Sequence, residues 1–128
     1  MDAREYVKTR LEQMGADSTS LGDKVYLTRS PQSDDKGGVP LPSIVWRQEG
    51  VNGAGVGIDG TSDPAVKLFE IEARSETADG ANMMSETVLN YLRPRLTHII
   101  ADYDEPDDTS QEVGVYFSHI LMVGVSNG

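Results

Sequence analysis

The stretch AVKLFEIEARS, residues 65–75, decides the fold, because apolar and charged side chains alternate along it. Phe69 and Ile71 fall on one side of an extended chain, and charged residues fall between them. This period of two predicts a strand with one buried and one polar face. Val66 and Leu68 follow the opposite phase, which indicates either a bulge or a strand whose two faces are both used.

The chain after this strand changes to the period of a helix. Apolar residues of the region from Thr77 to about Leu92 recur at helical spacing: Ala81, Met84, Val88 and Tyr91 or Leu92. Acidic residues concentrate in its first half and Arg93 stands at its end, as the helix dipole favours. Pro94 ends the pattern, so we expect one amphipathic helix here.

Working outward toward the N-terminus, a second set of residues recurs at spacings of three and four: Ala3, Tyr6, Val7, Arg10, Leu11 and Met14. Because Gly15 stands at a typical stop position, the pattern predicts a short helix over about residues 2–14. Runs rich in β-branched and aromatic residues predict strands at 25–28 and 44–49. Proline and glycine predict a loop over 30–42 and a glycine-rich hairpin loop over 51–63.

Toward the C-terminus, Ile99 begins a short strand that ends in an acidic turn, and residues 112–125 alternate over a long final strand. The order α-β-β-β-α-β-β predicts a single α+β domain over residues 1–128. We expect a mostly antiparallel sheet of four to five strands, with both helices packed on one face. Five side chains are predicted to be buried in its core: Ile71, Met84, Val88, Phe117 and Leu121.

The amino-acid composition excludes several classes of function. The chain has 21 acidic and 11 basic residues, a net charge of −10, which opposes binding to nucleic acid or to an anionic membrane. The absence of cysteine excludes disulfides, iron–sulfur clusters and cysteine nucleophiles. We find no signal peptide or membrane-spanning pattern. The 38% of hydrophobic residues, below the usual ~45–50%, is compatible with an obligate oligomer.

Motifs for catalysis or cofactor binding are weak. Residues 55–60, GVGIDG, match the letters of the dinucleotide fingerprint, but a strand follows where that motif needs a helix. His98 and His119 have no metal-ligand spacing and are interpreted as structural. The chain has no Gly-x-Ser-x-Gly elbow. We therefore expect no enzymatic activity, no metal and no cofactor.

Residues 96–128 contain no lysine or arginine, because Arg95 is the last such residue in the chain. Up to residue 64 the net charge is −3, and after it the net charge is −7. One surface of the fold should therefore be strongly electronegative. An acidic cluster at 102–108 lacks the glycine and closing glutamate of a calcium loop, so it is interpreted as a solvated acidic turn.

The sequence resembles the tail-terminator, or tail-completion, family of long-tailed bacteriophages and phage-like particles. The resemblance spans most of the chain: a Val25-Tyr26-Leu27 strand, a proline-containing loop, Pro42-Ser43-Ile44-Val45 opening the next strand, a variable hairpin loop, the strand at 69–75, the helix after it and an alternating last strand. It implies a non-enzymatic virion protein of the head–tail junction, assembled in the cytoplasm of the bacterial host. Such proteins form a ring, usually hexameric, that caps the tail tube and meets the head connector.

Two sets of site residues follow from this expectation. An electronegative bore or interface, through which genomic DNA passes without specific binding, is predicted from Glu70, Glu72, Asp102, Asp104, Glu105, Asp107 and Asp108. An interface loop that contacts a neighbouring subunit or the tube protein is predicted from Val51, Asn52, Val56, Ile58 and Asp59. Two alternatives remain open: another ring-forming neck protein, or an acidic DNA mimic that binds a basic protein.

Overall fold

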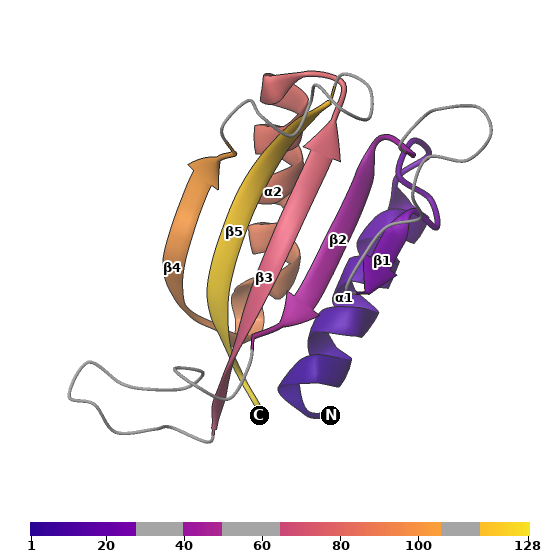
Figure 1. The fold of residues 1–128 in the computed structure, drawn as a ribbon. Helices are drawn as coiled ribbons and strands as arrows, with labels where there is room; N and C mark the ends of the chain where they lie inside the picture. The colour runs from indigo at the N-terminus through magenta and orange to yellow at the C-terminus, as the bar shows by residue number, and fades with distance from the viewer. Residues whose placement is uncertain (28–39, 50–64, 106–115) are drawn as a thin grey trace.

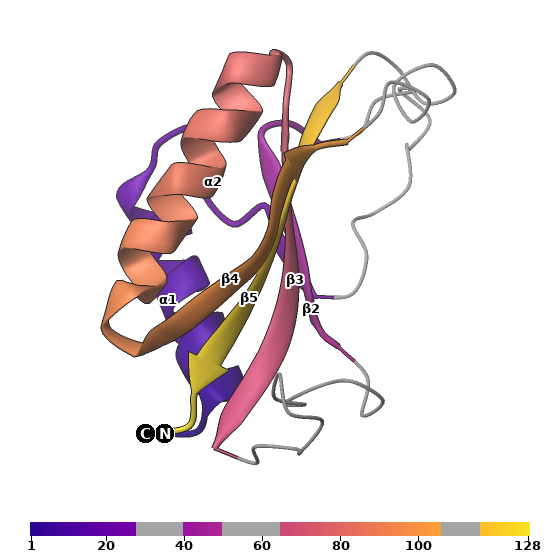
Figure 2. The same cartoon turned by 90° about the vertical axis from the view of Figure 1, so that its left-hand side faces the viewer.

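The computed structural model describes residues 1–27, 40–49, 65–105 and 116–128. Its elements, in chain order, are α1 (Ala3–Asp17), β1 (Val25–Leu27), β2 (Ser43–Gln48), β3 (Val66–Ser75), α2 (Ala78–Leu92), the 3-10 turn η1 (Arg93–Arg95), β4 (Leu96–Asp104) and β5 (Phe117–Ser126). The described strands form one sheet in the order β1-β2-β3-β5-β4. Both α-helices lie on the same face of it (Figures 1 and 2). The predicted α+β class is confirmed.

The sheet is mixed rather than wholly antiparallel. Strand β1 runs parallel to β2, with Val25 opposite Ile44, whereas β2, β3, β5 and β4 pair antiparallel. Alternation within a strand identifies its two faces but carries no information about the direction of its neighbour. The parallel pair was therefore outside what the sequence pattern could predict.

Strand β3 lies at the centre of the sheet and fixes its two faces. It pairs with β5 without interruption from Val66 to Ser75, so it contains no bulge on that side. Phe69 and Ile71 are buried on the face that the helices cover, while Leu68 on the other face is half-buried. The strand is therefore used on both faces, which was one of the two predicted explanations of its phase change.

Helix α1 is longer than predicted, because it continues past Gly15 to Asp17. A Cβ atom at Gly15 would lie 2.2 Å from the backbone oxygen of Gly22, a distance that no side chain tolerates. The glycine permits close packing of the helix on the turn that follows it, and Ser18 caps the helix instead. Gly15 thus marks the place where the helix packs on the following turn, and not the place where the helix ends.

The core lies between the sheet and the helices. Its buried side chains include Val7 and Leu11 of α1, Val88 and Leu92 of α2, and Leu121 of β5. Ile71, Val88 and Leu121 were correctly predicted to be buried. Two predictions need correction, because Met84 and Phe117 are only half-buried. Phe117 begins β5 and pairs with Ser75, the last residue of β3, so it lies at the end of the sheet.

The two last strands also differ from their predicted bounds. Strand β4 is much longer than predicted, extending from Leu96 to Asp104, and its register with β5 shifts twice, between Leu96 and His98 and between Ile99 and Ala101. These irregularities break the alternation from which a strand is predicted. Strand β5 extends from Phe117 to Ser126, and residues 112–115 of the predicted strand lie outside the described residues. The chain ends meet, since the Ala3 amide donates to Asn127 Oδ1 at 2.9 Å (Figure 2).

Several predictions concern residues outside the described ranges. They are the glycine-rich hairpin loop with its interface residues Val51, Asn52, Val56, Ile58 and Asp59, the motif at 55–60, most of the loop at 30–42, and the acids Asp107 and Asp108.

Candidate functional site

Strand β4 is an outer edge of the sheet in the part of the chain that the structure describes, since it pairs only with β5 there. Three of its large apolar side chains are exposed: Ile99 and Ile100 by 47% each and Tyr103 by 48%. We call these three residues the β4 apolar edge. An exposed edge strand offers backbone N–H and C=O groups on which another strand can form. This strand combines that template with apolar side chains.

The β4 apolar edge uses both faces of the sheet. Ile99 pairs with Val123, which lies on the helix-covered face, whereas Tyr103 pairs with Ile120, which lies on the opposite face. A partner placed on one face would therefore cover only one of the two side chains. A strand or loop that continues the sheet sideways would contact both. The distribution favours an edge-to-edge contact.

The opposite edge of the sheet is β1, a strand of three residues. Its last residue, Leu27, is 44% exposed. Strands β1 and β4 lie on opposite sides of the subunit (Figure 1). Two different, oppositely placed edges permit a head-to-tail contact between copies, and such contacts close into a ring when the rotation between copies allows it.

His119 of β5 connects to the end of β4 through two side-chain contacts. Its Nδ1 lies 2.8 Å from Oδ1 of Asp104, and its Nε2 contacts Oδ1 of Asp102. An imidazole that donates through both nitrogens to two carboxylates is in its protonated form. The His119 side chain is only 6% exposed, so this charged cluster is shielded on the histidine side. We call it the His119 clamp.

The environment shifts the protonation of His119. Burial works to lower the pKa of His119, but the hydrogen bonds and negative charges of Asp102 and Asp104 outweigh it and raise the pKa above the ordinary value of 6.5. When the imidazole loses its proton, one of its nitrogens becomes an acceptor and can no longer donate to a carboxylate. The end of β4 is therefore held more firmly when His119 is charged.

The face of the sheet away from the helices collects acidic side chains. Burial is the largest cause of a raised pKa at Glu70, and Arg47 opposes it. Three further glutamates lie close enough for their negative charges to raise the same pKa: Glu49, Glu72 and Glu105. Arg47 Nη2 lies 2.6 Å from Glu70 Oε2. We call these four glutamates the acidic face.

A second ion pair crosses the acidic face. Arg74 Nε lies 2.6 Å from Glu72 Oε2, and the Ser118 hydroxyl donates to the same carboxylate at 2.9 Å. The four carboxylates of the acidic face thus meet two guanidinium groups, those of Arg47 and Arg74. The acidic face remains negative, but Glu70 and Glu72 are not bare charges.

The predicted bore residues separate into two groups. Glu70, Glu72 and Glu105 belong to the acidic face, and the Glu105 amide donates to the Ser118 carbonyl at 2.9 Å. Asp102 and Asp104 pair with residues of the helix-covered face and belong to the His119 clamp. The structure therefore does not bring these five carboxylates onto one surface.

Sequence reasoning missed the role of His119. The alternation of the last strand puts His119 in phase with Leu121, which was a usable signal that it points toward the helix-covered face. Its two partners could not be found in this way, because the register shifts in β4 decide which residues lie opposite β5. His98, by contrast, is exposed and contacts Thr97 Oγ1 through Nδ1 at 2.9 Å.

No three histidine, aspartate or glutamate side chains of the described residues are grouped so that they could hold a metal ion. Neither described helix is long and apolar enough to cross a bilayer. Comparisons with protein-family models and with curated proteins found no match.

Proposed function

We propose that this chain is a tail terminator: a non-enzymatic protein whose copies form a ring, hexameric by the resemblance, that caps a phage tail tube. The observation that supports this proposal most is the β4 apolar edge. Ile99, Ile100 and Tyr103 expose apolar surface on both faces of an edge strand, and a single neighbour beside the sheet can bury all of it.

The opposite edge supplies the second half of the contact. Each copy places its β4 apolar edge against the β1 side of the next copy, where Leu27 is exposed. This pairing is heterologous, so every copy uses both edges and a closed ring has no free edge. A closed ring has a fixed number of subunits and presents one end to the tube and the other to the head connector.

The charge of the chain suits passage of DNA. With a net charge of −10, a ring of these subunits repels phosphate groups, and the acidic face is the described surface that we assign to the bore. DNA then moves through the ring without binding to it. The protein accordingly belongs to the head–tail junction of the virion, with the tail tube protein and the head connector as partners.

Electron micrographs of the purified full chain test the ring. We expect annular particles with a central opening. An acidic DNA mimic would instead remain a small particle and bind a basic protein, so fields of uniform monomers would contradict the proposal.

Assembling particles test the capping role and the bore assignment separately. Without the chain, tails should exceed their set length, because tube growth has no stop. With Glu70→Lys and Glu105→Lys together, tail length should stay normal and DNA ejection should slow, since the bore now attracts phosphates. Overlong tails with this double variant would place the acidic face at the capping interface instead.

A further inference from the structure

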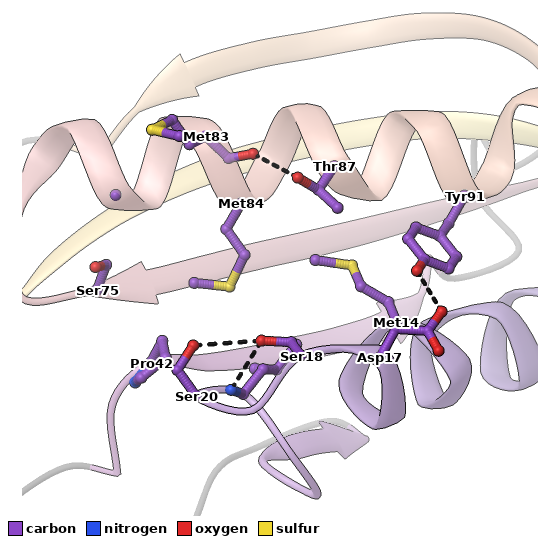
Figure 3. A pocket seen from close by; sticks show the side chains of 12 residues that line it. Met14, Asp17, Ser18, Ser20, Pro42, Ser75, Met83, Met84, Thr87 and Tyr91 are labelled. Atoms are coloured by element: carbon purple, nitrogen blue, oxygen red, sulfur yellow. Dashed lines mark hydrogen bonds between the residues drawn. The ribbon is translucent and has the colours of Figure 1, made fainter.

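A cleft of about 380 Å³ opens between the end of α1 with the turn after it and one side of α2 from Gly80 to Tyr91 (Figure 3). Pro42, just before β2, and Ser75, the last residue of β3, also line it. Met14, Met83 and Met84 line it together with Leu21. The cleft lies beside the helices, and neither the residues of the β4 apolar edge nor Leu27 of β1 are among those that line it. It is therefore a surface separate from the one that the ring proposal uses.

The surface of the cleft is mostly apolar and adaptable, although hydroxyl side chains such as those of Ser20 and Thr87 also line it. Three of the five methionines of the chain are in it. Met14 and Leu21 are buried beneath it, whereas Met83 is 66% exposed and extends the apolar surface outward. Methionine is unbranched and polarizable, so methionine-lined grooves fit apolar side chains of differing shape. Such a surface is typical of sites that receive a segment of another protein.

One end of the cleft is negative. Asp17, the last residue of α1, is the only charged residue among the described residues that line it. Its carboxylate is exposed and accepts a hydrogen bond from the Tyr91 hydroxyl at 2.6 Å. The last turn of α1 contains no basic residue, so the negative end of the helix dipole adds to the carboxylate. A cation is the favoured neighbour at this end.

The nearest base on α1 already has partners. Arg10 Nε donates to the Tyr91 carbonyl at 2.8 Å and its Nη1 donates to Gln13 Oε1 at 2.9 Å. Its guanidinium also lies over the Tyr91 ring, 5.2 Å from the ring centre. These contacts hold Tyr91 in place at the rim, and they leave the exposed side of Asp17 for an external cation.

We propose that this cleft binds a basic amphipathic helix of a partner protein, with an apolar side chain seated among the methionines and a lysine or arginine beside Asp17. Amphipathic helices dock in this way by placing apolar anchors in a groove. A small apolar molecule would fill the cleft but would bring no cation to Asp17 and would leave the outer part of Met83 exposed. A basic amphipathic helix fills the apolar cleft, brings a cation to Asp17 and covers Met83. It binds whether or not the chain forms a ring.

Nuclear magnetic resonance of the full chain, labelled with 13C at the methionine methyl groups, tests this directly. The probe is an 18-residue peptide of leucine and lysine in an amphipathic helical pattern. We expect the methyl resonances of Met14, Met83 and Met84 to shift in a saturable titration. Met1 and Met122 lie outside the cleft lining and serve as internal controls. Equal shifts at all five methyl groups, or none at the three in the cleft, would overturn the proposal.

Two further peptides separate helix recognition from apolar adhesion. A peptide with the same composition but a scrambled order, and a leucine–glutamate peptide with the original pattern, should each bind at least about tenfold more weakly. Equal binding of the glutamate peptide would show that Asp17 selects nothing. Saturable binding of a small apolar alcohol without binding of the leucine–lysine peptide would identify a small-molecule cleft and refute the helix site.

Variants of the chain complete the test. Asp17→Asn keeps the acceptor for Tyr91 and removes the charge, so it should weaken the leucine–lysine peptide about two- to fivefold, as an exposed ion pair does. Met83→Ser should weaken it further, whereas the control Asn82→Ser, at the neighbouring exposed residue of α2 outside the cleft lining, should leave it unchanged. Unchanged affinity in both cleft variants would refute the site. The mass of the assembly, measured separately, reports on the ring alone.

Discussion

Strands β3 and β4 belong to the same sheet but differ in position, pairing and burial. Strand β3 lies in the middle, pairs without interruption with β5, and has Phe69 fully buried against the helices. Strand β4 lies at the edge, shifts its register twice and leaves Ile99, Ile100 and Tyr103 about half exposed. The central strand is organised to stabilise the subunit. The edge strand has the features of a surface that is completed by a neighbour.

Of the proposed changes, truncation of a buried apolar residue in the central strand should lower the free energy of unfolding most. Phe69→Ala removes a fully buried ring that packs at 6.2 Å from the Trp46 ring, and we expect a loss of about 3–5 kcal/mol in the free energy of unfolding. Tyr103→Ala, on the edge, should cost a separate subunit less than about 1 kcal/mol, because Tyr103 is half-exposed there. Urea unfolding of both variants provides the comparison. Similar losses would erase the distinction between the strands.

Gly124 tests how the two regions are joined. It lies on β5 opposite His98, and a Cβ atom there would come within 2.5 Å of His98 Cε1 and 2.7 Å of Thr97 Oγ1. Both atoms belong to side chains, so they can move, and Gly124→Ala should cost about 1–3 kcal/mol as an overpacked site. Amide hydrogen exchange should accelerate along β4 and stay unchanged along the β2–β3 pair. Faster exchange throughout the sheet would contradict a local role.

The His119 clamp predicts a pH dependence that is confined to the edge. Because the pKa of His119 is raised on folding, its contribution to stability is fully present below the unfolded value of about 6.5 and is lost as the pH rises through the folded value. The wild-type chain should therefore lose stability over this range relative to His119→Gln. Denaturant unfolding at pH 5.5 and 8.5 measures the difference. Parallel pH profiles of the two proteins would rule out the clamp.

Loss of the Arg47–Glu70 ion pair of the acidic face should have the smallest effect. Arg47→Gln removes the partner of Glu70, but the Arg47 side chain is 53% exposed, so the expected loss is below about 1 kcal/mol. Thermal unfolding at low and high salt gives the measurement, and the small difference between the proteins should shrink in salt. A loss above about 2 kcal/mol would mean that Arg47 organises the acidic face.

The same contrast explains what could be predicted from the sequence. Regular alternation identified β3 and most of β5, and helical spacing identified α2, because these elements bury one continuous apolar side. At the edge, the register shifts hid most of β4, and no local pattern could connect Asp102 and Asp104 to His119. Gly15 was interpreted as a helix stop because its packing on Gly22 depends on tertiary structure.

The candidate site divides along similar lines. Acid-rich composition predicted negative surfaces, and Glu70 and Glu72 do lie on one face of β3, as their spacing of two requires. Their pairing with Arg47 and Arg74 depends on how β2 and β3 are arranged in space and on side-chain conformation, which composition does not contain. The cleft that the methionines line joins residues of α1, the turn after it and α2 with Pro42 before β2 and Ser75 of β3, so only the assembled fold brings them together.

The central claim is that the β4 apolar edge joins copies of this chain into a ring, and its most direct test is the mass of the purified protein by light scattering over a range of concentrations. The wild-type chain should have the mass of about six subunits, and Ile100→Lys should have the mass of one folded subunit, because a buried unpaired lysine at the contact opposes assembly. Met83→Lys, which places the same charge on an exposed methionine of α2, should keep the ring. A wild-type monomer, or a ring that Ile100→Lys leaves intact, would contradict the account.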